Sequence, residues 1–455
     1  MYKYFGTDGI RRIANTELTP ELVFRVAKAG AYVLSKHTSH TPTILIGRDT
    51  RISGTLIESA MVAGFLSYGA NVKILGVIPT PAVAYLTKKL NADASVVISA
   101  SHNTFEFNGI KFFSNKGMKI PDSIEEEIEE IMDLGNLNEF TAVNEKIGVS
   151  DISEELISEY EEFIVNIFEK DIKEKISSDF KVLVDTANGA TYKIAERTFN
   201  RLGISFDVIN NTPNGININD NCGSTHLNTL KEYVVSNKYD LGIAYDGDGD
   251  RCLAVDEMGR EINGDIMLAI LSKYLKDNDN LKNDTIVATV MSNLGLDVYS
   301  KNNNLNLLKT NVGDRYVLEQ MLKSGYNLGG EQSGHIILLD YNPTGDGILT
   351  SLMLITSLIK YDKKASELAN IIDIYPQVLV NAKVNNDKKY LFNDDKEINE
   401  IIKVVENEFA GEGRVLIRAS GTEPLVRVMI EGKDIEKITT KANEIAKIIE
   451  NKLKW

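Results

Sequence analysis

The segment Leu241-Gly242-Ile243-Ala244-Tyr245-Asp246-Gly247-Asp248-Gly249-Asp250-Arg251 joins an apolar strand pattern to a loop of alternating aspartate and glycine. Two other unusual loops have the same position: Ser99-Ala100-Ser101-His102-Asn103 follows an apolar run at 95–98, and Gly329-Gly330-Glu331-Gln332-Ser333-Gly334-His335 follows one at 326–328. Ligands of open α/β sheets gather at the carboxyl ends of strands. We therefore expect the three loops to converge on one cleft; three unrelated surface loops are the alternative, which their shared position disfavours.

Each of these loops follows the third of three apolar runs, and helical patterns separate the runs. The runs are residues 43–46, 71–75 and 95–98, then 181–184, 205–209 and 241–245, then 285–290, 305–308 and 326–328. Strands that alternate with helices indicate an α/β fold. An acidic amphipathic helix at about residues 153–175 suits a connector between the first two groups.

The pattern changes after Ile374-Tyr375-Pro376. It continues as strand 377–384, helix 395–409, strands 414–417 and 425–431, and helix 435–454. We predict an α/β protein with three similar mixed α/β domains and a smaller C-terminal β-α-β-β-α domain around a central cleft. The predicted domains are residues 1–152 with the Ser101 loop, 153–256 with a metal-binding loop, 257–374 with a sugar-binding loop, and 375–455 with a phosphate-binding loop.

The composition is that of a globular chain with several domains. The chain has 455 residues, of which 43% are hydrophobic and 25% charged, and this balance excludes a disordered or fibrous protein. The formal charge of −15 disfavours a nucleic-acid binder, which needs a basic field. No apolar run approaches the roughly 18 residues of a membrane-spanning helix, and the N-terminus lacks a signal-peptide pattern. Because Cys222 and Cys252 are the only cysteines, we expect a cytoplasmic protein without disulfides.

Three aspartates point to a metal site. Asp246, Asp248 and Asp250 alternate in an extended loop, so their carboxylates can face one point, and their repulsion favours a hard divalent cation. A calcium EF-hand needs glycine at the sixth position of its loop and a helix on each side. This loop has Arg251 at that position and strands on both sides, so we reject an EF-hand. Three carboxylates leave room for a phosphate oxygen, which favours Mg²⁺ in phosphoryl transfer. A plain Asp/Gly surface turn is the alternative.

The other two loops carry groups suited to phosphate and sugar chemistry. The Ser101 hydroxyl is a candidate nucleophile or phosphate carrier, although Ser-His-Asn can also cap a helix. Lys111 is either a charge directed at the site or an ordinary exposed lysine. The polar set at 331–335 suits vicinal sugar hydroxyls, whereas a lone histidine is more often structural.

The arginines indicate phosphate binding. Eight of the 13 lie in short Gly- or Asp-rich segments: Arg11, Arg12, Arg48, Arg51, Arg251, Arg315, Arg418 and Arg427. A guanidinium group binds phosphate oxygens bidentately, and structural ion pairs are the alternative for about half of them. The segment Arg418-Ala419-Ser420-Gly421-Thr422-Glu423-Pro424 adds two hydroxyls and free backbone N–H groups between two strands, which predicts a phosphate-binding turn.

Six segments together resemble the α-D-phosphohexomutase superfamily, in its order and from end to end of the chain. They are Phe5-Gly6-Thr7-Asp8-Gly9-Ile10-Arg11, Gly47-Arg48-Asp49-Thr50-Arg51, and residues 99–103, 246–251, 330–335 and 418–424. Within the superfamily the chain is most similar to the bacterial phosphoglucosamine mutases. The features that favour this group are Ser99, Gln332 and residues 313–317. Thr104 stands where the family commonly has proline, which leaves the rigidity of this loop open.

The resemblance implies an isomerase that converts glucosamine 6-phosphate to glucosamine 1-phosphate through a phosphoserine and a 1,6-bisphosphate, for amino-sugar nucleotide and cell-wall precursor synthesis. It implies a hexose 1,6-bisphosphate activator and one Mg²⁺ held by phosphorylated Ser101, Asp246, Asp248 and Asp250. It assigns catalytic roles to Ser101, His102, Lys111, Arg11, Arg251 and His335, and substrate binding to Glu331, Ser333, Arg418, Ser420, Gly421, Thr422 and Arg427. Closure about a hinge near Tyr375-Pro376 is expected to exclude water from the phosphoserine.

Three other functions stay open at this point. One is a phosphomannomutase or phosphoglucomutase, one is an aspartyl-phosphate phosphatase with Asp246 as nucleophile, and one is a non-catalytic sugar-phosphate sensor. The third aspartate and the Ser101 segment disfavour the phosphatase, and a sensor has no need of a hydroxyl beside a metal triad. The expected partners are small-molecule sugar phosphates, with neither nucleic acid nor membrane. A homodimer is one option for the oligomeric state.

Overall fold

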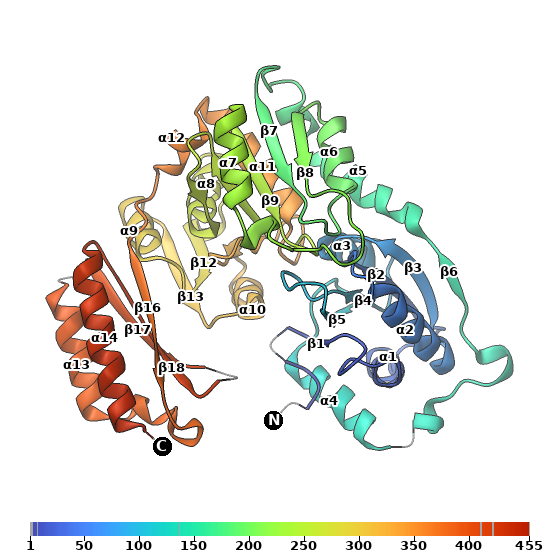
Figure 1. The fold of residues 1–455 in the computed structure, drawn as a ribbon. Helices are drawn as coiled ribbons and strands as arrows, with labels where there is room; N and C mark the ends of the chain where they lie inside the picture. Colours follow the sequence, from blue (N-terminus) through green and yellow to red (C-terminus); the bar gives the residue numbers. More distant parts are fainter. Residues whose placement is uncertain (1–2, 7, 136, 410–411, 421–422, 455) are drawn as a thin grey trace. The chain divides into compact units, whose positions relative to one another are not determined.

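The computed structural model describes residues 3–6, 8–135, 137–409, 412–420 and 423–454. The chain divides into two compact units, and Figure 1 labels their helices and strands. Unit 1 comprises Met1–Met291 and Leu305–Ile371, and unit 2 comprises Ser292–Asn304 and Ile372–Trp455. Three sheets lie in unit 1 and one in unit 2.

The first sheet of unit 1 has the strand order β1-β5-β4-β2-β3-β6. Its strands are β1 (Ile10–Ile13), β2 (Thr43–Arg48), β3 (Asn71–Val77), β4 (Ala94–Ile98), β5 (Phe107–Ser114) and β6 (Ser150–Ile152). Alternate residues of a strand face one side of the sheet. Ile44 and Ile46 of β2 therefore share one core with Val96 and Ile98 of β4, and Phe65 of helix α2 (Gly54–Tyr68) belongs to the same core.

The second and third sheets repeat the central part of the first. The second, in the order β11-β10-β9-β7-β8, consists of β7 (Lys181–Asp185), β8 (Ser205–Ile209), β9 (Leu241–Tyr245), β10 (Cys252–Asp256) and β11 (Glu261–Ile262). The third, in the order β13-β12-β14-β15, consists of β12 (Thr285–Thr289), β13 (Asn306–Thr310), β14 (Leu328–Gly330) and β15 (Ile336–Leu338).

In each of these three sheets, one strand of the parallel part is followed along the chain by an antiparallel neighbour. These strands are β4, β9 and β14, and their antiparallel neighbours are β5, β10 and β15. We call the second strand of each pair the return strand. The loop between the two strands of each pair is one of the three loops singled out in the sequence, so these loops lie at equivalent places in the three sheets.

Helices connect and cover these strands. In unit 1 they are α1 (Pro20–Ser35), α2, α3 (Thr80–Lys89), α4 (Asp122–Asp133), α5 (Ile157–Ile172), α6 (Ile194–Arg201), α7 (Asn228–Asn237), α8 (Gly264–Lys276), α10 (Asp314–Ser324), α11 (Gly347–Tyr361) and α12 (Ala365–Ala369). Side chains close the first turns of α8 and α11, where Asn263 and Asp346 accept hydrogen bonds from backbone N–H groups.

Unit 2 contains a three-stranded antiparallel sheet, β16-β18-β17, with α13 and α14 on one face (Figure 1). Its elements are α9 (Leu294–Asn302), β16 (Gln377–Lys383), α13 (Lys396–Glu408), β17 (Gly413–Ala419), β18 (Leu425–Gly432) and α14 (Ile435–Lys452). Its core joins Val426, Val428 and Ile430 of β18 to Ile438 and Ile445 of α14. The β-α-β-β-α order predicted after residue 376 is confirmed.

The predicted strands match the structure, with one exception. The run at 326–328 overlaps β14 only at Leu328, because the strand continues into Gly329 and Gly330. These glycines permit close packing: a Cβ atom at Gly329 would lie 2.6 Å from Met321 Sδ on α10. The predicted fold class, three mixed α/β domains and a small C-terminal domain, is confirmed.

Candidate active site

Ser101 lies just beyond the end of β4, in the first of the three loops. Its backbone has φ = 51°, in the left-handed region, and the residue is 2% exposed. Its Oγ donates a hydrogen bond of 2.7 Å to Asp246 Oδ2 in the loop after β9. The predicted approach of the first two loops is therefore present in the structure, although the two residues are 145 positions apart.

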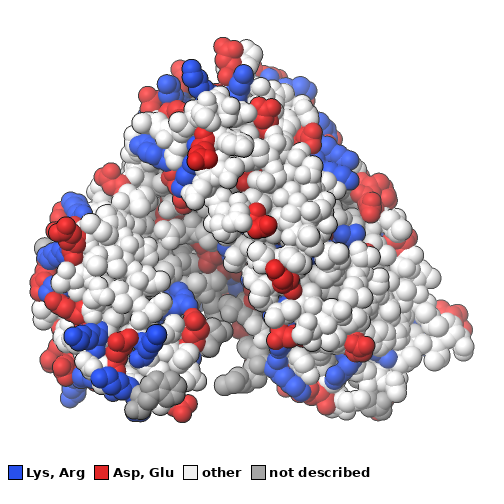
Figure 2. All heavy atoms as spheres, in the orientation of Figure 1, with Lys and Arg blue, Asp and Glu red and all other residues white. Residues whose placement is uncertain are grey.

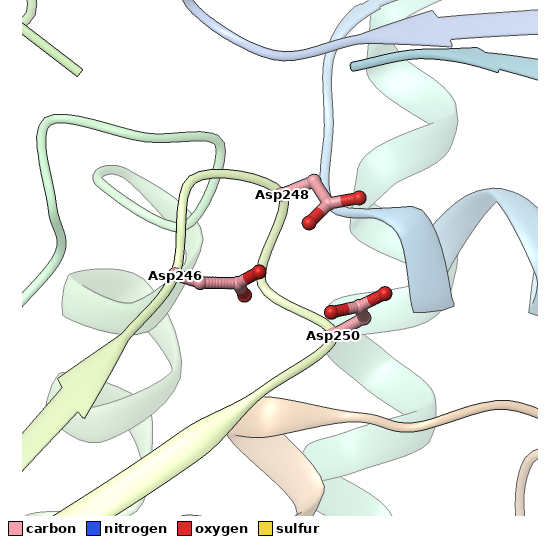
Figure 3. Close-up of side chains that lie close together, drawn as sticks. All are labelled: Asp246, Asp248 and Asp250. Atoms are coloured by element: carbon pink, nitrogen blue, oxygen red, sulfur yellow. The ribbon is translucent and has the colours of Figure 1, made fainter. Parts of the chain in front are cut away.

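Asp246, Asp248 and Asp250 form a buried cluster between β9 and β10. Each offers a carboxylate oxygen, and these oxygens lie within 4.8 Å of one another. Figure 3 shows the three carboxylates turned toward a common space. Gly247 and Gly249 let this loop pack closely against its neighbours: a Cβ atom at Gly247 would lie 2.7 Å from the Ser101 carbonyl oxygen.

The electrostatics of the cluster suit a cation. Burial, followed by the charges of Asp250 and Asp248, raises the pKa of Asp246 well above its ordinary value. Asp248 Oδ1 and Asp250 Oδ1 are buried without a hydrogen-bond partner. Buried acceptors without donors are costly, whereas a hard divalent cation prefers carboxylate oxygens. The residues present therefore fit Mg²⁺.

Three cationic or basic side chains lie close to the aspartates, and a fourth, Arg11, contacts the Ser101 loop. Lys111 on β5 lies 3.0 Å from Asp248 and 3.7 Å from Asp250. Burial by itself lowers the pKa of Lys111, but the aspartates outweigh it and hold this pKa well above the ordinary value. Arg251 Nε lies 4.0 Å from Asp250, and His335 Nδ1 lies 3.6 Å from it. Arg11 donates to Asn103 Oδ1, 3.1 Å away, in the Ser101 loop.

The third loop meets the second, metal-binding loop through His335. Its Nδ1 faces Asp250, and its Nε2 accepts a hydrogen bond of 3.0 Å from the Gly345 N–H. Glu331 accepts a hydrogen bond from the Gly313 N–H, and Ser333 is half-buried in the turn between Glu331 and His335. Contacts within unit 1 therefore join the second loop to the first, through Ser101 and Asp246, and to the third, through Asp250 and His335. A single cleft formed by all three loops stays a prediction.

His102 stands beside the candidate nucleophile. Its Nδ1 lies 3.4 Å from Ser101 Oγ. Burial, followed by the positive charges of Arg251 and Arg11, lowers the pKa of His102 to about 4. The imidazole is therefore neutral at physiological pH and can accept or donate a hydrogen bond at this position.

An ion-pair network that the sequence did not indicate connects Asp8, Lys119, Asp314 and His335. Lys119 Nζ lies 2.5 Å from Asp8 and 2.6 Å from Asp314, and Asp314 lies 3.5 Å from His335 Nε2. Asp8 also pairs with Arg11 and Lys111. Asp8 and Asp314 lie in segments quoted for the family resemblance, but nothing in the sequence distinguishes Lys119 from other lysines.

The predicted phosphate-binding turn lies in unit 2. Arg418 of β17 and Arg427 of β18 are directly opposite one another in the strand register, and Ser420 is buried at the start of the turn. Like charges opposite each other destabilise a sheet unless an anion lies between them. Arg427 pairs with Glu423 at 3.1 Å. Gly421 and Thr422, also predicted to bind substrate, lie outside the described residues.

The next features are the surface charges, the apolar character of the helices and the two cysteines. Acidic and basic side chains are interspersed on the face shown in Figure 2. Among the described residues, no helix combines the length and the apolar character needed to cross a membrane. Cys222 and Cys252 are both free and buried.

Family models for a four-domain enzyme match successive parts of the chain. They are described as phosphoglucomutase/phosphomannomutase α/β/α domain I (residues 2–138), domain II (158–259) and domain III (263–375), and the C-terminal domain (379–448). The exact domain bounds given by the sequence stay a prediction.

Curated relatives match the chain over its full length. A phosphoglucosamine mutase from Ruminiclostridium cellulolyticum is 54% identical over 456 residues, and one from Acetivibrio thermocellus is 54% identical over 454 residues, each covering 100% of both chains. A crystal structure described as a putative phosphomannomutase from Thermus thermophilus has a TM-score of 0.79 at 22% identity, and the match covers 98% of each chain.

Proposed function

The chain belongs to the phosphoglucomutase/phosphomannomutase family, and we propose that it interconverts glucosamine 6-phosphate and glucosamine 1-phosphate with Ser101 as the phosphoryl carrier. The observation that carries this proposal is the hydrogen bond of 2.7 Å between Ser101 Oγ and Asp246, inside a cluster of three buried carboxylates. The amino-sugar substrate rests on the full-length relatives, which are phosphoglucosamine mutases.

The reaction consists of two transfers in opposite directions. In the first, the bond between phosphorus and Ser101 Oγ breaks and a bond between phosphorus and sugar O1 forms, while the O1 proton ends on Ser101 Oγ. The product is the 1,6-bisphosphate. After this intermediate turns around, the bond between phosphorus and O6 breaks, Ser101 Oγ recovers the phosphoryl group, and the Oγ proton ends on O6. Atoms and charge balance over the cycle.

The side chains of unit 1 supply positioning and charge. Asp246, Asp248 and Asp250, with phospho-Ser101, would hold Mg²⁺, which neutralises charge on a transferring phosphoryl group. With Ser101 unphosphorylated, as in this structure, Asp246 Oδ2 accepts a hydrogen bond from the Ser101 hydroxyl. Lys111 stays an ammonium group in its ion pairs, so it contributes positive charge and hydrogen-bond donors and does not act as a general base.

Other residues would hold the sugar and its second phosphate. Arg11, Arg251, His102 and His335 lie around Ser101 and the aspartates and would orient the phosphoryl group and the reacting hydroxyl. Glu331 and Ser333 would bind sugar hydroxyls. In unit 2, Arg418, Ser420, Gly421, Thr422 and Arg427 would bind the phosphate that is not being transferred, at either end of the sugar. Closure near residues 375–376 would exclude water from the phosphoserine. A 1,6-bisphosphate activator, a homodimer and a cytoplasmic location stay predictions.

A coupled assay with Mg²⁺ tests the proposal on glucosamine, glucose and mannose 6-phosphates. We expect the highest kcat/KM with glucosamine 6-phosphate; a preference for another sugar would assign the chain to a different phosphohexomutase activity. Ser101→Ala should abolish turnover without changing the melting temperature, whereas Ser158→Ala, on the exposed surface of α5, should change neither. Substantial mutase activity of Ser101→Ala would overturn the role of this serine.

Labelling distinguishes the mutase from a phosphatase. A phosphoserine resists hydroxylamine, whereas an acyl phosphate on Asp246 is cleaved by it. We expect a hydroxylamine-resistant label that is lost in Ser101→Ala. A label that hydroxylamine removes would support the aspartyl-phosphate phosphatase, and saturable binding without isomerisation would support a sensor.

A further inference from the structure

Arg51 is fully buried beside the Ser101 loop, and every one of its guanidinium N–H groups has a partner. Its Nε donates to Asp49, 2.9 Å away. Its Nη1 donates to the carbonyl oxygens of Thr104 and Phe107, and its Nη2 donates to those of Ser101 (3.0 Å) and Asn103 (2.8 Å). Because all five donors are used within the protein, Arg51 has none left for a substrate phosphate.

Asn219 holds the same two carbonyl oxygens from another part of the chain. Its Nδ2 donates to Ser101 O and to Asn103 O, both at 2.8 Å. Asn219 is 2% exposed and lies in the segment between β8 and β9, in the domain that carries the aspartates. It also borders Gly247, where a Cβ atom would lie 2.6 Å from Asn219 Nδ2. Asn219 therefore contacts both the Ser101 loop and the metal-binding loop.

These contacts act on a backbone conformation that serine seldom adopts. Ser101 has φ = 51°, a left-handed conformation that is unfavourable for residues other than glycine. A second chain of hydrogen bonds supports it from the other side, from Ser101 N–H to Ser99 Oγ and from Ser99 Oγ to Asp49. The Ser101 backbone is thus fixed at both its N–H and its carbonyl group.

We propose that Arg51 and Asn219 are positioning residues for phosphoryl transfer, which fix the carbonyl groups of Ser101 and Asn103 so that Ser101 Oγ faces the three aspartates. This inference rests on the proposed function of Ser101. Arg51 fixes the loop to its own domain, and Asn219 fixes it to the domain of the aspartates. Without Asn219, we expect the loop to keep its overall conformation, but Ser101 Oγ would no longer be held at a fixed position relative to Asp246.

Asn219→Gly is the most direct test. Asn219 has φ = 56°, which glycine adopts without strain, so the variant removes the amide without disturbing the backbone. Asn221→Gly is a matched control, because Asn221 has φ = 52°, lies in the same segment and is exposed. Asn219→Asp, which keeps the size of the side chain and replaces the amide donors with acceptors, is a second variant in case the glycine variant fails to fold.

Two measurements decide the inference. We expect kcat of Asn219→Gly to fall about 10- to 100-fold, as misplacement by about 1 Å would produce, with KM for the sugar phosphate within about threefold of wild type. Hydrogen exchange of a peptide spanning residues 99–107 should become faster, while Asn221→Gly matches wild type in both measurements. Asn219→Asp should show the same losses.

Other outcomes count against the inference. Unchanged kcat, or reduced kcat with unchanged exchange at 99–107, would show that Asn219 does not act through the Ser101 loop. Equal losses in Asn221→Gly would show a general effect on the segment. If the wild-type protein converts no sugar phosphate, the proposed function fails, and the exchange measurement alone still decides whether Asn219 fixes the loop.

Discussion

Replacing Asp246 with asparagine should separate the stability of the aspartate cluster from its ability to bind metal. The carboxylate oxygens lie within 4.8 Å of one another, and at that upper limit two unit charges repel each other by about 3.5 kcal/mol at an effective dielectric constant of about 20. Asp246 takes part in two such pairs, with Asp248 and Asp250. The full repulsion does not develop, because burial and these neighbours raise the pKa of Asp246 and Lys111 offsets part of the charge.

Asp246→Asn keeps the shape of the side chain and removes the charge. Its amide oxygen can still accept the hydrogen bond from Arg251 N–H, 3.1 Å away in wild type, and its amide group can donate to Ser101 Oγ. In the presence of a chelator, we therefore expect the melting temperature to stay the same or to rise by a few degrees. The variant should also lose the stabilisation by Mg²⁺, which in wild type reaches about 2.7 kcal/mol at 100 times the Kd.

The assay is thermal unfolding with and without Mg²⁺, with Asp256→Asn as the control. Asp256 is equally buried, but it accepts hydrogen bonds from Arg260 and Met258. Asp256→Asn should lower the melting temperature and keep the Mg²⁺ effect. The reasoning is refuted if Asp246→Asn keeps the full Mg²⁺ effect, or if it is strongly destabilised in the chelator.

Two further predictions concern a buried carboxyl group and the phosphate-binding turn. Burial, and after it the nearby charge of Asp8, raises the pKa of Glu125 to about 8. Between pH 4.5 and pH 8 the folded protein therefore keeps a proton on Glu125 that the unfolded chain has released. Because of this residue, the free energy of unfolding falls as pH rises between these values, by at most about 1.4 kcal/mol per pH unit. Glu125→Gln should therefore gain in melting temperature over wild type between pH 6 and pH 8, whereas an equal difference at both pH values, or the same trend in the exposed control Glu126→Gln, would contradict the cause. Arg418→Lys should raise KM for the sugar phosphate about 10-fold or more with a smaller change in kcat, because lysine lacks the bidentate fork. Steady-state kinetics would contradict this if KM stayed unchanged, or if the exposed Arg197→Lys had the same effect.

The local features of this fold were predictable because each rests on neighbouring residues. The run Leu241–Tyr245 is apolar throughout and forms a strand buried at every position. The aspartates that follow it at alternate positions meet because the loop is short. Ser101 and Asp246, however, come from different domains, and periodicity gives no information on distant pairs. Their approach was expected only from the rule that ligand sites lie at the carboxyl ends of strands.

The residues that sequence reasoning missed act through distant partners. Lys119 is one of many lysines until folding places it between Asp8 and Asp314. Arg51 was grouped with candidate phosphate ligands, but its guanidinium group binds four backbone carbonyl oxygens of residues 101–107 instead. Backbone carbonyl groups have no signature in a sequence, so a side chain that binds them cannot be told from one that binds phosphate.

The return strands explain how one site acquires both signs of charge. Each loop begins after a parallel strand, where the hydroxyl or carboxylate groups lie, and ends at an antiparallel strand. In each of these three sheets a basic side chain lies on that strand or immediately before it: the cations are Lys111 on β5 and Arg251 before β10, and the third basic side chain is His335 before β15. Because two paired strands fix both ends of each loop, the cations and the carboxylates are held at set distances before any substrate binds. The sequence pattern indicated only the parallel strands, and so it predicted the anionic half of the site more directly than the cationic half.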